Sequence, residues 1–256
     1  MRASRRAWGV RSSSETASPL GSDSFFTLAR TYIPPVDLGK GRVGLVVVDM
    51  QYNDASPDQG FGLALSIIEP GSMDYFNERN ETVVVPNIAR LVAAFRDRDL
   101  PIVYVCVGSE YRDLRDMPRR HREWIRRIEQ ESGVSDILWS QNPAYAVREE
   151  FAPRPEDTIV RKTAFGAFTS STIDETLRAL ELDTLAVVGI ATNCCVSTTI
   201  RDAADTGYGV VVVEECTGDY DALTHDVAIR GLHFNFARVV PTVDQLVDRL
   251  DAGAEV

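Results

Sequence analysis

Histidine is scarce in this sequence: of its 256 residues, three are histidine, namely His121, His225 and His233. The stretch from residue 52 to residue 82 contains none. Long apolar runs are missing as well, because none approaches the roughly 18 residues that a membrane-spanning helix needs. Few histidines are therefore available to activate a catalytic nucleophile. The missing apolar runs lead us to expect no membrane partner.

Basic residues are also in deficit. Lysine and arginine number 27 against 38 aspartates and glutamates, which gives a formal net charge of −11. A chain this acidic binds nucleic acid or an anionic membrane poorly unless it carries a local basic patch. We therefore expect no nucleic-acid partner and look for a small-molecule ligand instead.

The N-terminal stretch lacks the apolar core of a secretory signal. Residues 1–24 contain four arginines with no apolar run after them, so we interpret them as a flexible N-terminal arm. Their Arg- and Ser-rich composition leaves a transit peptide as the alternative. In the absence of a secretory signal, we expect the protein in the cytoplasm and its four cysteines as free thiols.

Apolar runs and helical patterns alternate along the rest of the chain. The strand-like runs are Val43–Asp49, Pro101–Val107, Thr158–Lys162, Asp183–Gly189, Val210–Glu214 and Ala237–Val240. Helical patterns cover Val85–Arg98, Ser171–Leu180, Val196–Thr206, Leu223–Phe236 and Thr242–Leu250. This alternation predicts an α/β fold: one domain over residues 25–256, with three α/β/α layers around a six-stranded, mainly parallel, Rossmann-like sheet.

Two segments show no such regularity. Residues 52–82 are expected to form a long, loop-rich excursion after the first strand. Residues 113–131 are dense in arginine and aspartate and are expected to mix loop and short helix.

Three kinds of reactive side chain stand at the predicted strand ends, where open parallel sheets bind ligands. Asp49 follows the first strand, Lys162 ends the third, and Cys194 and Cys195 follow the fourth. Each has a structural explanation when taken alone. Asp49 could cap the next segment, Lys162 could be a solvated strand end, and the cysteines could be small core residues.

Taken together, an acid, an amine and a thiol favour nucleophilic catalysis. A thiol at a helix N-terminus lies in the positive end of the helix dipole, which lowers its pKa and favours the thiolate. A neighbouring lysine adds to this effect, and a carboxylate can accept the proton as general base, so no histidine is needed. The residues alone leave open which of the two cysteines is the nucleophile.

Three segments carry a family resemblance: VVVDMQ at 46–51, RKTAFGAF at 161–168 and GIATNCCVSTTIRDA at 189–203. In order and spacing they resemble the signature segments of the isochorismatase-like cysteine hydrolases. That superfamily includes N-carbamoylsarcosine amidohydrolase and the ureidoacrylate, biuret and triuret hydrolases. The resemblance spans residues 43–243.

The resemblance implies a role for each reactive residue. In the family pattern G-x-x-T-x-x-C-V, the nucleophile is the cysteine directly before the valine, which here is Cys195 before Val196. Cys194 is then an incidental neighbour. Asp49 matches the family's general base, and Lys162 matches its lysine, so the implied catalytic residues are Asp49, Lys162 and Cys195.

The resemblance also implies an oxyanion hole. The family has a cis peptide bond in this turn, which falls at Ile190–Ala191 in this sequence. It would bring the N–H of Ala191 beside the N–H of Cys195. The implied reaction is attack of the Cys195 thiolate on an amide or ureide carbonyl, departure of ammonia, and hydrolysis of the thioester.

Other subgroups and a different class of protein remain as alternatives. Nicotinamidases of this superfamily bind a metal through histidines after the first strand; residues 52–82 contain none, so we expect no metal and no cofactor. Isochorismatases cleave a vinyl ether and can lack the nucleophile, whereas Cys195 favours amide chemistry. A non-catalytic thiol-bearing binding or redox-sensing module is the third alternative, against which the intact Asp49–Lys162–Cys195 set argues.

Substrate contacts are predicted from several segments. GSEYRDLRDMP at 108–118 resembles an Arg/Asp-rich segment of ureide hydrolases, although it could equally be a solvated loop with internal ion pairs. Phe165 is expected in the core. The candidate substrate-binding residues are Gln51, Tyr52, Glu110, Arg112, Phe168, Ile190, His233 and Asn235.

The function predicted from these observations is hydrolysis of a small linear amide or ureide, of the biuret, triuret or N-carbamoyl amino acid type, with release of ammonia. Family members commonly form oligomers, so the resemblance implies a homodimer or homotetramer. Residues 1–24 and 52–82 are the expected interface elements.

Overall fold

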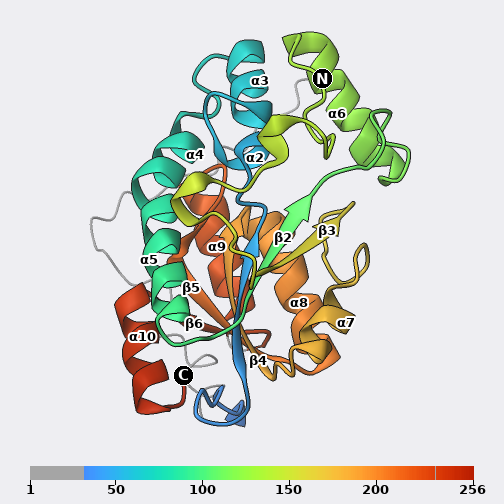
Figure 1. The fold of residues 1–256 in the computed structure, drawn as a ribbon. Coiled ribbons are helices and arrows are strands. Elements are labelled where there is room, and N and C mark those ends of the chain that lie inside the picture. The colour runs from blue at the N-terminus through green and yellow to red at the C-terminus, as the bar shows by residue number, and fades with distance from the viewer. Residues whose placement is uncertain (1–31, 234) are drawn as a thin grey trace, which may run out of the picture.

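The computed structural model describes residues 32–233 and 235–256. The predicted N-terminal arm, residues 1–24, lies outside them. A central sheet carries helices on both of its faces, and further helices gather beyond one end of the strands (Figure 1). The predicted three-layer α/β fold is confirmed.

All strand pairs in the described residues are parallel, in the order β3-β2-β1-β4-β5-β6. The strands are β1 (Val43–Val48), β2 (Ile102–Val107), β3 (Thr158–Lys162), β4 (Thr184–Ile190), β5 (Gly209–Gly218) and β6 (Arg238–Val240). Every residue of β1, β2 and β4 is buried. Burial on both faces explains why these strands are continuous apolar runs and do not alternate with polar residues.

The two faces of the sheet pack against different helices. Successive side chains of a strand point to opposite faces, so Leu45 and Val47 pack with α5 and α10, whereas Val46 and Val48 pack with α7, α8 and α9. The bounds are α5 (Val85–Arg96), α7 (Ile173–Ala179), α8 (Ser197–Thr206), α9 (Ala222–Leu232) and α10 (Val243–Ala252). The predicted helices agree with these, except that α9 ends at Leu232 and not at Phe236.

The prediction of a loop-rich excursion over residues 52–82 is wrong, because most of this segment is helical. It contains α2 (Tyr52–Ala55), α3 (Gly60–Ile68), α4 (Asp74–Arg79) and the π-helical turn η1 (Asn80–Val84). Each helix spans nine residues or fewer. Helices this short do not repeat an apolar stripe often enough for the sequence pattern to reveal them.

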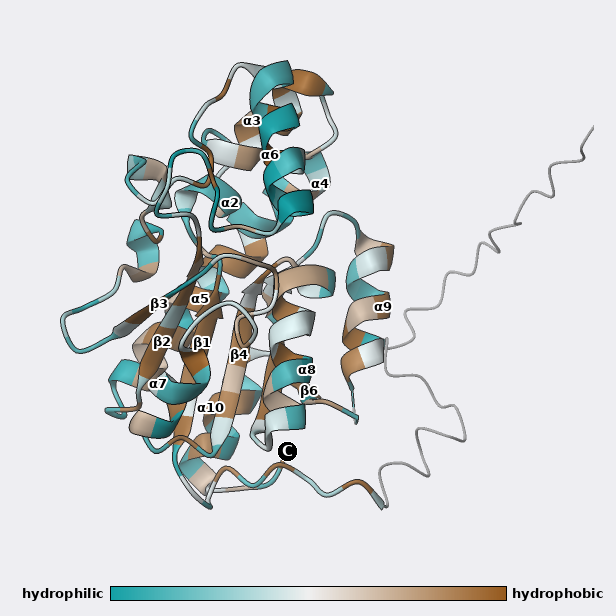
Figure 2. Ribbon diagram, turned by 90° about the vertical axis from the view of Figure 1, so that its right-hand side faces the viewer, coloured by the Kyte–Doolittle hydropathy of each residue, from teal (hydrophilic) through white to brown (hydrophobic). Residues whose placement is uncertain are grey.

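Residues 113–131 hold a longer helix than predicted. Helix α6 runs over Arg119–Ser132 and buries His121, Ile125 and Ile128 along one stripe, while its outer face is hydrophilic (Figure 2). Its buried stripe packs in one apolar cluster with residues of α3. We call α2, α3 and α6 the cap, because they lie beyond the carboxyl ends of the strands (Figure 1).

Two single-turn helices follow the cap before β3, namely η2 (Pro143–Tyr145) and η3 (Glu149–Phe151). No helix within residues 32–233 and 235–256 has both the length and the apolar character needed to cross a membrane.

Candidate active site

Asp49 follows β1 directly and supplies a carboxyl at the end of the central strand. Its backbone is left-handed, with φ 53°, a conformation that aspartate tolerates better than most residues. Its N–H donates to the carbonyl of Val105 on β2 at 2.8 Å. The residue is 2% exposed, so the sheet places a fixed, buried carboxyl at this edge.

Lys162 is the last residue of β3 and is fully buried. Its Nζ lies 2.8 Å from Oδ2 of Asp49, 2.8 Å from the carbonyl oxygen of Ala164 and 3.3 Å from Sγ of Cys195. A buried ammonium is tolerated when it is paired and hydrogen-bonded. The structure thus brings Asp49, Lys162 and Cys195 together through one ammonium group.

Cys195 lies in η4 (Thr192–Val196), a π-helical turn that joins β4 to α8. Such turns are frequent at functional sites. Cys194, the preceding residue, is partly buried and packs against the apolar clusters on both faces of the sheet. The hydrogen bond from Lys162 reaches Cys195, which distinguishes the two adjacent thiols.

Burial and the close contacts act in opposite directions on both the acid and the amine. It raises the pKa of the Asp49 carboxyl, while Lys162 and the Cys195 thiol oppose that rise. Burial acts to lower the pKa of Lys162, but Asp49 and Cys195 outweigh it, so the pKa of Lys162 is raised. Lys162 therefore keeps its charge at neutral pH.

The sequence predicts a lowered pKa for Cys195, and this prediction is wrong. Contact with Cys194, burial and the negative charge of Asp49 raise the pKa of Cys195 well above its ordinary value, and Lys162 opposes them only in part. The thiol therefore keeps its proton at rest. A base must remove that proton when the thiol reacts.

The turn before Cys195 has the predicted backbone geometry: the Ile190–Ala191 peptide bond is cis. The N–H groups of Cys194 and Val196 both donate to the carbonyl of Ala191, at 2.9 Å and 3.2 Å. Ala191 and Cys195 themselves line a cavity above the strand ends.

That cavity lies between the carboxyl ends of the strands and the cap, and its wall is largely aromatic and aliphatic. The residues that line it are Asp49, Asp54, Phe61, Met73, Phe76, Val107, His121, Trp124, Leu138, Phe165, Ile190, Ala191, Cys194, Cys195 and Tyr220. A few polar groups in an apolar wall are typical of a small-molecule site. Among the described residues, no group of three or more His, Cys, Asp or Glu side chains is placed to hold a metal ion.

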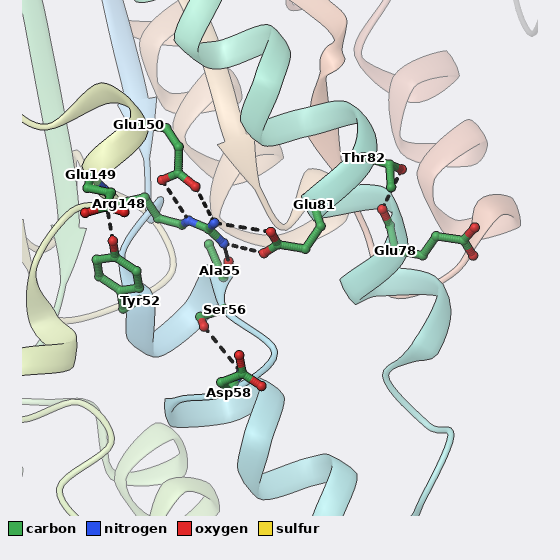
Figure 3. A network of polar contacts seen from close by, with 10 residues as sticks. All are labelled: Tyr52, Ala55, Ser56, Asp58, Glu78, Glu81, Thr82, Arg148, Glu149 and Glu150. Carbon is green, nitrogen blue, oxygen red and sulfur yellow. Dashed lines mark hydrogen bonds and ion pairs between the residues drawn. The ribbon is translucent and has the colours of Figure 1, made fainter.

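Two predicted substrate-binding residues next to Asp49 are engaged in the protein itself. Gln51 is buried, and its Nε2 donates to the carbonyl of Tyr145 at 2.9 Å. The hydroxyl of Tyr52 accepts from the N–H of Glu149 at 3.2 Å, and the Arg148 guanidinium lies 5.6 Å from its ring centroid (Figure 3). Neither residue is among those that line the cavity.

The segment 108–118 forms ion pairs on the surface. Arg112 binds Asp136 through two hydrogen bonds, of 2.7 Å and 2.6 Å, and Glu110 pairs with Arg161. Neither Glu110 nor Arg112 is among the lining residues. This arrangement corresponds to the alternative considered for the segment, a solvated loop with internal ion pairs.

The remaining predicted contacts divide into two groups. Ile190 lines the cavity. Phe168 packs against the ring of Tyr208 at 6.1 Å, His233 is buried and forms an isolated backbone bridge with Ala237, and Asn235 is exposed. These three are not among the cavity's lining residues, so substrate contact by them stays a prediction without geometric support.

Sequence reasoning misses the part of the site that the cap supplies. Asp54 of α2 and His121 and Trp124 of α6 line the cavity. Phe165, which is expected in the core, is 41% exposed and lies 4.7 Å from His121, ring centroid to ring centroid. The signal available in the sequence is the spacing of His121, Ile125 and Ile128, which marks one face of a helix.

A family model described as "Isochorismatase domain" matches residues 43–244, from the start of β1 into α10. The chain belongs to the isochorismatase family. This membership confirms the resemblance that the three motif segments predict, and it makes the chain an isochorismatase-family hydrolase.

Curated relatives in the isochorismatase family include two ureidoacrylate amidohydrolases named RutB. The protein from Variovorax paradoxus is 30% identical over 191 residues, covering 72% of this chain and 71% of the relative. The protein from Cronobacter sakazakii is 32% identical over 181 residues, covering 68% and 73%. An uncharacterised isochorismatase family protein of Bacillus subtilis, YrdC, is 25% identical, covering 68% and 86%.

Solved structures share the isochorismatase fold. A cysteine hydrolase from Pseudomonas syringae pv. phaseolicola superposes with a TM-score of 0.69 at 24% identity, covering 86% of this chain and 96% of the other. An N-carbamoylsarcosine amidase from Thermoplasma acidophilum gives a TM-score of 0.55 at 24% identity, covering 79% and 97%. At this level of identity, the two structures establish the fold.

Proposed function

We propose that this isochorismatase-family hydrolase is a cysteine-dependent amidohydrolase that cleaves the C–N bond of a small linear amide or ureide and releases ammonia. The observation that carries the proposal is the contact of Lys162 Nζ with Oδ2 of Asp49 at 2.8 Å and with Sγ of Cys195 at 3.3 Å. One ammonium thereby holds together an acid and a thiol that both line the cavity. This is the arrangement of base, nucleophile and orienting group that covalent catalysis needs.

The first half of the reaction forms a thioester. Asp49 takes the proton of the Cys195 thiol as the sulfur attacks the carbonyl carbon. Lys162 balances the negative charge that moves from carboxylate to sulfur and back. The N–H groups of Ala191 and Cys195 stabilise the oxyanion, a kind of contact worth about 2.7–4 kcal/mol per donor in other enzymes. Protonated Asp49 then gives its proton to the leaving nitrogen, and ammonia departs.

The second half of the reaction releases the acid. Asp49, again ionised, takes a proton from a water molecule that attacks the thioester carbonyl. The C–S bond breaks, the proton returns to the Cys195 sulfur, and the carboxylate product leaves. The raised pKa of Cys195 suits this cycle, because the resting enzyme holds a thiol and not an exposed, oxidisable thiolate.

Ureides and simple amides are both within this proposal. The two RutB relatives, at 30% and 32% identity, are named for a ureide substrate. The aromatic wall of the cavity favours a substrate with an apolar body. Metal-free nicotinamide hydrolysis, vinyl-ether hydrolysis of the isochorismatase type and a non-catalytic thiol-bearing module are the competing functions that the test must separate.

An ammonia-release screen separates these functions. The panel contains biuret, triuret, N-carbamoyl amino acids, nicotinamide, maleamate, ureidoacrylate and short aliphatic amides, with isochorismate as a separate assay. We expect release from at least one linear amide or ureide, together with an acyl adduct on the Cys195 peptide by mass spectrometry after acid quench. Turnover of isochorismate or of nicotinamide without turnover of any linear amide or ureide contradicts the proposal. So does amide hydrolysis without an adduct on Cys195.

A further inference from the structure

The charges that line the cavity do not balance. Two carboxyl side chains, Asp49 and Asp54, line it, and the ammonium of Lys162 lies 2.8 Å from Asp49. Oδ2 of Asp54 is buried and has no hydrogen-bond partner in the described part of the chain. No arginine or lysine is among the described lining residues. Among the described residues, Asp54 therefore has no ion-pair partner of its own, a costly situation for a buried carboxyl.

Arg148 contacts the helix that carries Asp54, but it supplies no free positive charge. Its Nη1 donates to the carbonyl of Ala55 at 2.7 Å, at the end of α2. The same guanidinium pairs with Glu81 and with Glu150 (Figure 3). Arg148 therefore fixes the position of α2, while its own charge is already met by two carboxylates.

This imbalance favours the neutral form of the Asp54 carboxyl. Burial and the neighbouring charge of Asp49 raise the pKa of Asp54 well above its ordinary value, and Lys162 opposes them only in part. His121, which also lines the cavity, brings no positive charge either, because burial and Lys162 lower its pKa to about 4. A cation that enters the cavity would find a carboxyl able to ionise beside it.

Aromatic rings surround the same space. Three stacked or tilted pairs line the cavity, with centroids 5.1 Å, 5.3 Å and 4.7 Å apart: Phe76 with Tyr220, Phe61 with Trp124, and His121 with Phe165. The faces of Phe, Tyr and Trp rings attract ammonium groups, most strongly where water is excluded. An unpaired carboxyl within an aromatic wall is a recognised way to hold an organic cation.

We propose that the cavity takes a small amide whose far end carries an ammonium group, with Asp54 as its counter-charge and the aromatic rings as its wall. This inference rests on the proposed function, since it names the substrate class of the same site. It also disfavours substrates that carry a carboxylate, because such a group would face Asp54 and no lining cation. N-carbamoyl amino acids fall into this disfavoured class.

The test is a binding experiment that does not depend on turnover. The Cys195→Ala variant is titrated by calorimetry with three probes of similar size: trimethylammonioacetamide, its uncharged isostere 3,3-dimethylbutanamide, and the anion succinamate. We expect the cation to bind about tenfold or more tightly than the isostere, and succinamate to bind most weakly. Adding Asp54→Asn should bring the ratio of cation to isostere close to one.

Asp58→Asn serves as the matched control. Asp58 lies four residues further along the chain, is exposed and does not line the cavity, so the same chemical change there should leave the ratio intact. Tightest binding of succinamate, equal binding of cation and isostere, no binding of any probe, or a ratio unchanged by Asp54→Asn overturns the inference. Selective binding of the cation without ammonia release by the wild-type enzyme upholds the inference and refutes the proposed function.

Discussion

Lys162 has an unusual position for its residue type: the side chain has no exposure, and its Nζ contacts a carboxylate, a carbonyl and a thiol. Two adjacent cysteines at the end of β4 acquire different chemistry from this one group. Cys195 receives the hydrogen bond from the ammonium, whereas Cys194 lines the same cavity and packs against the two apolar clusters. The contact with Lys162 therefore distinguishes the two thiols and agrees with the role that the family resemblance implies for Cys195.

Exchanging each cysteine separately tests this difference. Cys195→Ala removes the nucleophile, and we expect kcat to fall by at least about a thousandfold. Cys194→Ala removes a packing thiol, and we expect kcat to stay within about tenfold of wild type. Steady-state ammonia release from the best substrate of the screen measures both. An inactive Cys194→Ala beside an active Cys195→Ala would reverse the assignment.

The positions of the reactive residues could be predicted from the sequence, and the protonation state could not. Asp49, Lys162 and the cysteines stand at the ends of valine-rich strands, and parallel topology gathers such ends at one edge. The pKa of Cys195 depends instead on burial and on the proximity of Cys194 and Asp49. Burial and proximity to other side chains can be known only from the folded structure. Here they raise the pKa of Cys195, whereas the helix dipole alone would lower it.

At the scale of helices and strands, the cap was the least predictable part. Strands and long helices show their apolar periods over enough residues to be recognised. Helices α2 and α3 are short, and in α6 the buried residues are separated by exposed arginines. The cavity-lining residues Asp54 and His121 of the cap were missed for this reason.

The side chain of Arg148 joins helix α2 to two other helical segments, because it binds Ala55 of α2, Glu81 of η1 and Glu150 of η3. Its side chain is 8% exposed. Arg148→Met leaves two carboxylates without their shared partner, and we expect the free energy of unfolding to fall by about 2–4 kcal/mol. Urea denaturation followed by circular dichroism measures this change.

Arg119→Met is the control for the Arg148 experiment. Arg119 pairs with Glu123 on the outer face of α6, where the two side chains are 81% and 58% exposed. Loss of an exposed pair of this kind should cost less than about 0.5 kcal/mol. Equal losses for the two variants would show that Arg148 does not stabilise the fold through its buried contacts.

The whole molecule contains buried histidines whose titration links stability to pH. His225 is 2% exposed; its ring hydrogen-bonds Thr192 at 2.9 Å and Arg79 at 3.0 Å. Burial and the charge of Arg79 lower its pKa to about 4, as burial and Lys162 do for His121. An unfolded chain protonates histidine near pH 6.5. Below that pH the unfolded state binds more protons than the folded state, so acid favours unfolding.

We therefore expect the contribution of these two histidines to stability to be full above pH 6.5 and to be lost as the pH falls from there toward 4. Each buried histidine should account for about 1–2 kcal/mol of the loss between pH 7.5 and pH 5. Urea denaturation at several pH values measures the decline. His225→Gln should flatten the slope over this interval, and an unchanged slope would mean that His225 does not contribute to it.

Chain order and sheet order together determine when the reactive residues can meet. Asp49 follows β1, Lys162 ends β3 and Cys195 follows β4 along the chain, whereas β1 lies between β2 and β4 in the sheet, so Cys195 is synthesised only after the other two residues. Asp49, Lys162 and Cys195 can therefore meet only after β4 has paired with β1. Before that pairing, the thiol has neither the proposed base nor the lysine beside it, and the proposed reaction cannot take place.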